Sequence, residues 1–221
     1  STDYENYNGT GTFEGQPFKD LRMLFYYEVT AEMFCTTKDS GITDLKGLDG
    51  QRFNPGGTGT SAEDLCHKIL GLFDVNPDYF VAADAYSNRE IVGTIKLGPV
   101  VDSYVMQLNA SVPVNVINLS DEEIAKIIEA YPFLIKVTIP AGTYTGQDYD
   151  TLTFGVKCLV IVSADLDESL VYDMCKTMNE NSADLAAGNA ILSEMTDPSF
   201  LCTNIPLHPG AEKYYAEQGL I

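Results

Sequence analysis

The sequence predicts an α/β protein built on a parallel sheet. Apolar runs of strand length alternate along the chain with segments whose apolar residues recur at helical spacing, which is typical of such a sheet. Helix starts are marked by Thr, Ser or Asp followed three residues later by Glu, at Thr60, Ser87, Ser120 and Asp165. With 221 residues and 45% hydrophobic residues, the chain can bury one sizeable core or two small ones.

The order of these elements follows from their boundaries. Residues 1–20 are polar and Gly-rich, which indicates a helix end followed by a surface loop. We expect strands over residues 21–37, 50–53, 79–83, 100–108, 114–119, 134–139 and 154–162. We expect one helix to begin at Ser61 and another at Pro209. Three more should follow the capping-box patterns that start at Ser87, Ser120 and Asp165.

A short internal sequence similarity favours two lobes. The stretches MFCTTKDSGI and LVIVSADLDE are each an apolar strand that ends in a polar turn containing Asp. Two such strands are suited to lie side by side as a hinge. The similarity covers few residues and supports two lobes only weakly.

The charge of the chain excludes several classes of partner. Thirteen Lys and Arg against 32 Asp and Glu give a formal net charge of −19, which repels nucleic acid and anionic lipid surfaces. Arg22, Arg52 and Arg89 are the only arginines, so no basic patch is available. An anionic ligand would therefore have to be held by local dipoles and hydroxyl groups.

The cysteines indicate no metal site. Cys35, Cys66, Cys158, Cys175 and Cys202 are widely spaced, with no CxxC pair and no neighbouring His pair. We interpret them as buried thiols, with the pairing of any one disulfide left open. The sequence indicates no metal and no cofactor. No run approaches the roughly 20 apolar residues that span a bilayer, and the chain shows no signal peptide, so an exported protein would already have lost its leader.

The most informative stretch is FNPGGTGTSAED, residues 53–64, which places a Gly-rich loop between a strand and a helix. The first turn of a helix presents unpaired N–H groups and the positive end of a dipole, and these bind carboxylate or phosphate without a cationic side chain. Gly57 and Gly59 allow close approach of a ligand, while Thr58, Thr60 and Ser61 offer hydroxyl donors. Alternatively, the glycines only form a tight turn and Thr60 only caps its own helix.

Other chemistry finds little support in the sequence. The loop has no Lys after Gly59, as a Walker phosphate loop would require, and no GxGxxG fingerprint occurs in a suitable position. His67 and His208 accompany no GxSxG or reactive-Cys signature, so no catalytic residue is predicted. Tyr hydroxyls at a cleft can bind a polar ligand, which makes Tyr27 with Glu28, and Tyr144, candidates or else simply amphipathic edge residues.

Several segments together resemble the TAXI subfamily of TRAP-transporter solute receptors. They occur in the order of that family and cover nearly the whole chain: YNGTGTFEGQPFKDLRML, SGITDLKGLDGQRFNPGGTGTSAED, LSDEEIAKIIEAYPF, TIPAGTYTGQD and PLHPGAEKYYAEQG. The chain departs from the family by beginning after its opening strand, Gly-rich turn and helix. It also has QLNASVP where the family has a Gly-Gly-x-Pro turn, so Gln107 is placed to reshape specificity.

The resemblance implies a two-lobed periplasmic-binding-protein type II fold, joined by crossing hinge strands, with an incomplete first lobe. Residues 1–38 and 135–221 would form lobe one with the hinge strands, and residues 39–134 would form lobe two. Lobes of this kind close around a ligand by hinge motion. The family's Gly-Ser-Gly-Thr loop, which receives a ligand carboxylate, maps onto Gly57, Thr58, Gly59, Thr60 and Ser61, with Thr58 in place of Ser.

The functional expectation is an extracytoplasmic, non-enzymatic receptor. It would capture a small carboxylate, either a dicarboxylate or a glutamate-like compound, for a TRAP-type membrane permease, and act as a monomer, with or without a lipid anchor. Tyr27, Glu28, Tyr144 and Gln147 would face the loop from the other lobe or the hinge. The alternatives are an enzyme that handles an anionic ester at the same helix start, or a ligand sensor that has no transporter.

Overall fold

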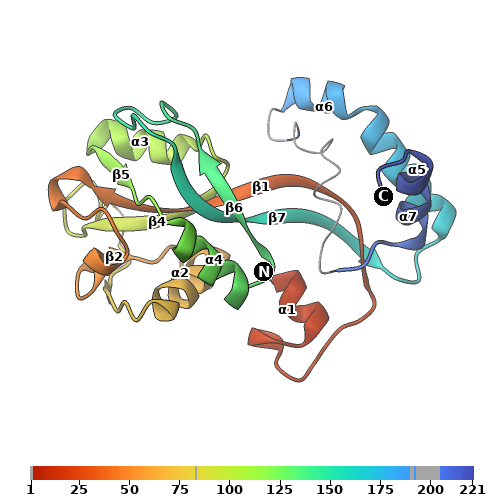
Figure 1. The fold of residues 1–221 in the computed structure, drawn as a ribbon, viewed down its shortest axis with the longest axis horizontal. Coiled ribbons are helices and arrows are strands. Elements are labelled where there is room, and N and C mark those ends of the chain that lie inside the picture. The colour runs from red at the N-terminus through yellow and green to blue at the C-terminus, as the bar shows by residue number, and fades with distance from the viewer. Residues whose placement is uncertain (1, 83, 190–191, 193–204) are drawn as a thin grey trace. The chain divides into compact units, whose positions relative to one another are not determined.

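The computed structural model describes residues 2–82, 84–189, 192 and 205–221 (Figure 1). The chain forms two compact units. Unit 1 comprises Ser1–Val29 and Lys157–Ile221, and unit 2 comprises Thr30–Val156. The break between the two units falls inside two long strands. The lobe boundaries expected from the sequence, at residues 39 and 134, stay a prediction.

One sheet holds the strands together, in the order β3-β2-β4-β1-β7-β6, with β5 paired to β1. The strands are β1 (Leu21–Thr37), β2 (Arg52–Asn54), β3 (Asp78–Tyr79), β4 (Gly93–Gly98), β5 (Val114–Val116), β6 (Leu134–Ile139) and β7 (Thr151–Ser163). β2 runs parallel to β3 and β4, whereas β1 is antiparallel to β4 and β5, and β6 is antiparallel to β7. The sheet is therefore mixed, and the prediction of a parallel sheet was wrong.

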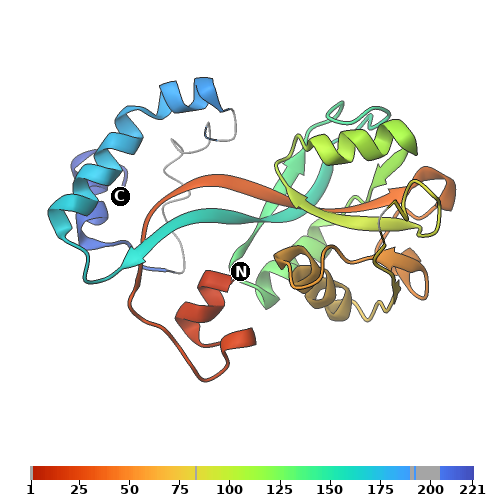
Figure 2. The same cartoon turned by 180° about the vertical axis from the view of Figure 1, so that it is seen from behind.

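Unit 2 has helices on both faces of its part of the sheet. The helices α2 (Ser61–Leu72) and α4 (Asp121–Ala130) lie on one face and α3 (Ser103–Ser111) on the other (Figure 2). The larger apolar core fills the space under α2 and α4, where Leu65, Ile69 and Ile127 are fully buried against Phe53 and Phe154. The spacing of the buried residues along α2 and α4 is the amphipathic pattern predicted from the sequence.

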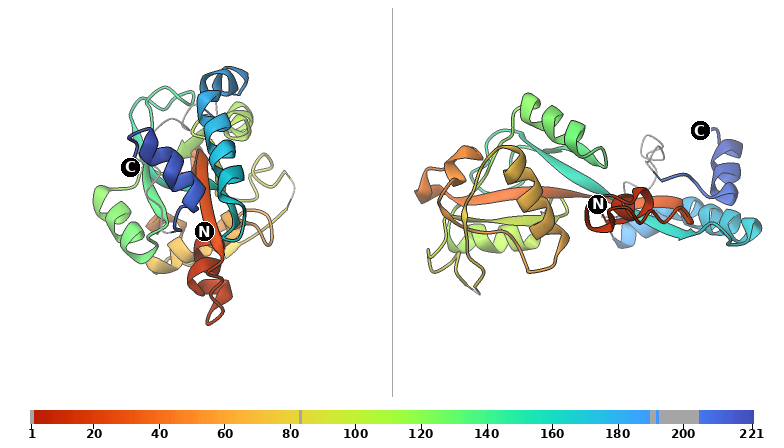
Figure 3. Two further views of the ribbon diagram at one scale, coloured as in Figure 1. Left: turned by 90° about the vertical axis from the view of Figure 1, so that its right-hand side faces the viewer. Right: turned by 90° about the horizontal axis from the view of Figure 1, so that it is seen from below.

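Unit 1 packs three helices against the outer parts of the two long strands. The three helices are α1 (Thr2–Asn8), α5 (Glu168–Glu180) and α7 (Pro209–Glu217). A fourth helix, α6 (Ser182–Gly188), follows α5. Figure 3 shows α5 and α7 lying against each other, and the Tyr172 hydroxyl donates to the Glu217 carboxylate at 2.6 Å across that contact. Gly210 lies so close to the Glu168 carbonyl that a Cβ atom would collide with it, which explains the glycine after Pro209.

Two predictions between residues 84 and 111 were wrong. The segment after Ser87 is a series of turns that ends in β4, because Asp84 and Arg89 adopt left-handed backbone angles (φ 59° for both) that interrupt a helix. The expected strand over residues 100–108 is mostly helix α3. Asp102 caps it by accepting from the Tyr104 and Val105 amides at 2.9 and 3.0 Å, a start signal that the apolar run concealed.

Smaller differences concern element ends. The cap of α5 is Asp167 rather than Asp165, and its carboxylate accepts from the Ser169 and Leu170 amides. The strand expected over residues 79–83 is the two-residue β3, and Ala83 lies outside the described residues. The capping box at Ser120 is confirmed, as are the long first strand and the final helix at Pro209.

Candidate functional site

The Gly-rich loop of unit 2 leads directly from β2 into α2. Thr60 is the N-cap of α2, and its hydroxyl accepts from the Glu63 amide at 3.3 Å while donating to the Gly57 carbonyl at 2.6 Å. Asn54 steadies the start of the loop by accepting from the Gly56 amide at 2.9 Å. Gly56 and Gly59 have positive φ angles of 105° and 77°, so these positions favour glycine. The loop residues from Gly57 to Ser61 are exposed to solvent.

Not every amide of this helix start is free. The Glu63 carboxylate accepts from the Gly59 amide at 2.6 Å, and the Glu63 amide is taken by Thr60. In the part of the chain that the structure describes, the amides of Ser61 and Ala62 have no acceptor, as expected for the first two positions of a helix. These two N–H groups are therefore available to an anion from outside the chain.

An open strand edge lies beside the same loop. β2 pairs with β4 only at Gly93 and Thr94, so β4 continues alone on this side toward Gly98. Just before β4, the Val92 carbonyl accepts from the Thr37 amide and the Val92 amide donates to the Arg52 carbonyl, so this residue is bonded on both sides. Ile95 and Leu97 lie beyond the last residue of β4 that pairs with β2.

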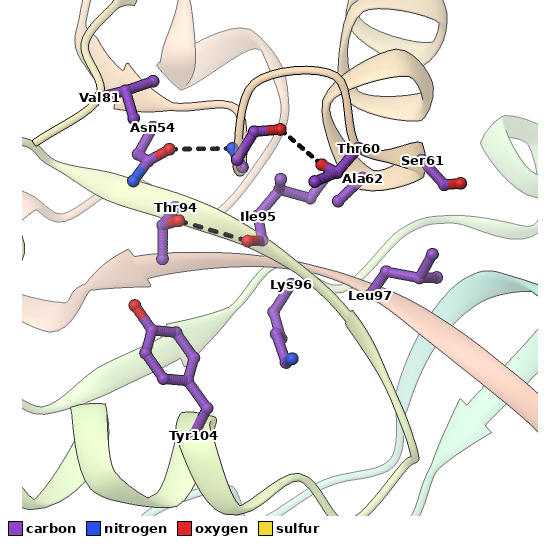
Figure 4. Close-up of a pocket in the computed structure, with 12 residues that line it drawn as sticks. Asn54, Thr60, Ser61, Ala62, Val81, Thr94, Ile95, Lys96, Leu97 and Tyr104 are labelled. Carbon is purple, nitrogen blue, oxygen red and sulfur yellow. Dashed lines mark hydrogen bonds between the residues drawn. The ribbon is translucent and has the colours of Figure 1, made fainter. Parts of the chain in front are cut away.

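The loop and the strand edge enclose a cavity of about 450 Å³, a volume in the usual range for small-molecule sites. Its polar lining includes Asn54, Thr60, Ser61, Thr94, Lys96 and Tyr104. Figure 4 shows Thr60 and Ser61 on one side of β4, and Lys96 and Tyr104 on the other. Both Gly57 and Ala62 also line it, so the two residues whose amides lack an acceptor, Ser61 and Ala62, belong to its wall.

The cavity is electrostatically unlike the rest of this acidic protein. Among the described residues that line it, Lys96 is the one charged residue and none is acidic. The Lys96 ammonium is 3.6 Å from the Asp102 carboxylate, whose side chain is buried and caps α3. That pair holds the ammonium at the cavity wall, where its charge and the dipole of α2 both favour an anion.

Tyr144 and Gln147, two of the predicted ligand contacts, are buried in unit 2. They line neither this cavity nor a second, smaller cavity of unit 2 that adjoins it. The Tyr144 hydroxyl donates to the Val100 carbonyl at 2.8 Å and accepts from the Asp102 amide at 3.2 Å, and burial raises the pKa of Tyr144 to about 12. The Gln147 amide group donates to the Ile139 and Tyr149 carbonyls and to the Thr151 hydroxyl. These bonds order the loop between β6 and β7.

The remaining predicted residues are distributed between the two units. Thr58 and Gly59 lie in the exposed loop, although only its other members line the cavity. Gln107 on α3 lines an adjoining cavity of unit 2. Tyr27 and Glu28 lie on the part of β1 that belongs to unit 1, so they are not part of the cavity described for unit 2.

Sequence reasoning missed Asn54, Thr94, Lys96 and Tyr104. Lys96 and Thr94 lay in a segment predicted to be helical, and Tyr104 lay in a segment predicted to be a strand. A usable signal was present, because Thr94, Ile95, Lys96 and Leu97 alternate in polarity as a half-buried strand does.

A buried carboxyl group lies beneath this site. Glu32 of β1, paired with Leu97 of β4, is fully buried, and neither of its carboxyl oxygens has a hydrogen-bond partner. Burial raises the pKa of Glu32 well above its usual value, against a smaller opposite effect of the Lys96 charge. The folded protein therefore favours the neutral form of this group.

The structure gives no sign of a metal centre in its described residues: no three His, Cys, Asp or Glu side chains gather there to hold an ion. Cys35, Cys66 and Cys175 are buried thiols and Cys158 is half-buried, while Cys202 lies outside the described residues. His67 stacks on Tyr79, and the His208 ring accepts from the Gly210 amide at the start of α7. None of the described helices has the length and apolar character of a membrane span.

Comparisons with known proteins give a family and some distant structural likenesses. A model of the NMT1-like family matches residues 1–219. YckB of Bacillus subtilis is 14% identical over 79% of this chain, with a TM-score of 0.42. A polar amino acid ABC uptake transporter substrate-binding protein from Streptococcus thermophilus is 14% identical over 98% of the chain, with a TM-score of 0.36.

A further likeness is to the alkanesulfonate-binding protein SsuA of Xanthomonas axonopodis pv. citri, at 15% identity over 89% of this chain, with a TM-score of 0.37. The matches cover 59% of the YckB chain, 73% of the Streptococcus chain and 59% of the SsuA chain. This protein thus spans less than two thirds of the length of two of the three.

Proposed function

The chain belongs to the NMT1-like family. We propose that it is a solute-binding protein of the periplasmic-binding-protein type that serves a transporter, and that its ligand is a small carboxylate held in the unit 2 cavity. The observation that carries this proposal is the pair of free amides, on Ser61 and Ala62, in a cavity wall that has no acidic side chain. An anion there receives two N–H donors and the dipole of α2, and a ligand that extends across the edge of β4 would also meet the charge of Lys96 (Figure 4).

The ligand would also meet a strand edge. Main-chain groups of Ile95 and Leu97 and the hydroxyls of Ser61 and Tyr104 offer further hydrogen bonds, while Val81 and the Ile95 side chain supply apolar contact. This mixture of fixed polar groups and apolar wall is typical of pre-formed small-molecule sites. Capture of a soluble anion is thereby possible despite the net charge of −19.

The resemblance to TAXI receptors extends the proposal to a partner and a place. The receptor would work outside the cytoplasm and deliver its ligand to a TRAP-type permease. Closure of the lobes on the ligand would give the form that the permease recognises, with Tyr27 and Glu28 as contacts from outside unit 2. The proteins of this family are typically non-enzymatic, and neither His67 nor His208 lines the cavity.

The test compares two lysines of unit 2 that each pair with an aspartate. Succinate, glutamate and caproate are titrated into the protein by calorimetry, and we expect at least one to bind. Lys96→Gln should weaken that binding about tenfold, because the ammonium at the cavity wall is lost. Lys136→Gln, which removes the partner of Asp121 at 2.7 Å away from the cavity, should leave the affinity unchanged.

Two results would contradict the proposal. One is equal affinity of the wild-type protein and the Lys96→Gln variant for a carboxylate that does bind. The other is turnover of a carboxylate ester by the purified protein, which would favour the enzyme alternative at the same helix start.

A further inference from the structure

A second cavity adjoins the first inside unit 2. Its volume is about 230 Å³, and it lies between α3 and the turns that precede β4. Asn54, Thr94 and Tyr104 line both cavities, so these three side chains form a shared wall. A ligand that extends past these three side chains would lie partly at the helix start of α2 and partly in the second cavity.

The second cavity carries the opposite charge. Of the lining residues that the structure describes, Asp84 is the only charged one, and none is Lys or Arg. The nearest guanidinium in the sequence, that of Arg89, is paired with Asp39. Asp84 lines this cavity together with Tyr104 of the shared wall. Burial raises the pKa of Tyr104, with smaller contributions in the same direction from Cys35, Asp102 and Asp84.

The neutral groups around Asp84 are suited to a hydrogen-bond donor. The hydroxyl oxygens of Ser87 and Ser111 lie 3.5 Å apart in the lining, and the Gln107 amide lies on the same helix as Ser111. An ammonium group has three N–H donors and finds acceptors here in the carboxylate and the two hydroxyls. A second carboxylate would instead face Asp84 with no cation to offset the repulsion.

We infer that the ligand carries a carboxylate at one end and a cationic nitrogen at the other, with the nitrogen bound in the second cavity by Asp84, Ser87 and Ser111. This inference rests on the proposed function, which supplies the carboxylate end. Of the two ligand classes that the family resemblance suggests, it disfavours dicarboxylates and requires a cationic nitrogen remote from the carboxylate, because the two adjoining cavities differ in the sign of their charge.

The test uses three probes with the same six-carbon chain. Aminocaproate, adipate and caproate share a carboxylate at one end of the chain. The other end is an ammonium in aminocaproate, a second carboxylate in adipate and a methyl group in caproate. Titration calorimetry of the wild-type protein should give the highest affinity for aminocaproate, about tenfold above caproate, and the lowest for adipate. Each comparison isolates the group that enters the second cavity.

Two aspartates provide a matched pair of variants. Asp84→Asn removes the charge at a residue whose side chain makes no hydrogen bond to the residues that the structure describes, and Asn tolerates its left-handed backbone angle. This variant should bring the ratio of aminocaproate to caproate affinity close to one. Asp74→Asn is the control, because Asp74 has a similar φ of 53° and is exposed outside both cavities. It should keep the wild-type ratio.

The outcomes separate this inference from the proposed function. If caproate binds and Lys96→Gln weakens it, while adipate binds as well as aminocaproate or Asp84→Asn keeps the ratio, the inference is overturned and the carboxylate site stands. If none of the three probes binds at millimolar concentration, the inference is overturned, and the proposed function is overturned with it when succinate and glutamate also fail to bind. A preference for aminocaproate that Asp84→Asn abolishes and Asp74→Asn retains supports the inference.

Discussion

The two helix starts of α2 and α4 look alike in sequence and differ in what they can bind. Each begins with a hydroxyl residue followed three positions later by Glu, and each hydroxyl accepts from that Glu amide, at 3.3 Å for Thr60 and 3.2 Å for Ser120. In α4 the first turn is Asp121, Glu122 and Glu123, and the box closes back on the Ser120 amide. In α2 the first two residues are Ser61 and Ala62.

The difference shows that a helix dipole alone does not make an anion site. At α4 the acidic first turn already satisfies the positive end of the helix, and an incoming anion would meet negative side chains. At α2 the Glu63 side chain bonds to Gly59, one residue before the cap, and neutral residues occupy the first two positions. An open strand edge and Lys96 then complete the wall.

The largest effect is expected from exchanging the first residue of the two helices. Ser61→Asp gives α2 the side chain that begins α4 and places a negative charge in the cavity wall. We expect carboxylate affinity to fall about a hundredfold, or roughly 2.7 kcal/mol, in titration calorimetry. Asp121→Ser, the reciprocal change on α4, should leave affinity unchanged. Retained affinity in Ser61→Asp would show that the ligand does not bind at this helix start.

The next largest effect concerns the buried carboxyl group of Glu32, beneath α2. Burial raises the pKa of Cys66 on that helix, and the charge of Glu32 is the second cause, so the charge state of Glu32 affects this helix. Because the pKa of Glu32 is higher in the folded protein than in the unfolded chain, the folded state holds a proton that the unfolded state has lost. Stability should fall as pH rises above the ordinary glutamate pKa of 4.5, at up to about 1.4 kcal/mol per pH unit until the folded pKa is reached.

Urea unfolding at a series of pH values measures this slope. Glu32→Gln should flatten it relative to the wild-type protein, since a neutral amide cannot ionise. A Glu122→Gln variant at the exposed start of α4 is the control and should keep the slope. The same pH dependence in wild-type and Glu32→Gln proteins would contradict a neutral Glu32.

The smallest effects come from the two caps themselves. Thr60→Ala and Ser120→Ala each remove one cap hydrogen bond and should destabilise the protein by about 1 kcal/mol in thermal unfolding. Only Thr60→Ala should also weaken carboxylate binding, by about twofold to fivefold, because the hydroxyl also fixes Gly57 in the cavity wall. Equal binding losses in both variants would mean that affinity follows overall stability rather than the loop.

The sequence alone determined the elements whose signals are local. The start of α4 at Ser120, the entry into α2 at Thr60 and the long first strand follow from capping residues and apolar spacing, which act within a few residues. The exposed Gly-rich loop at a helix start was predictable for the same reason. The charge of −19 directed attention to dipoles and hydroxyls rather than to a basic patch, and their role in ligand binding stays a prediction.

Only the tertiary structure decided which residues share the site. Lys96 and Tyr104 lie together because β4 continues beyond its pairing with β2 and because α3 lies on the face of the sheet opposite α2. Local sequence spacing predicts neither feature. Tyr144 and Gln147 looked available in sequence, yet their polar atoms are used by nearby main-chain groups. Strand pairing and burial join residues far apart in the chain, so propensity could not assign these roles.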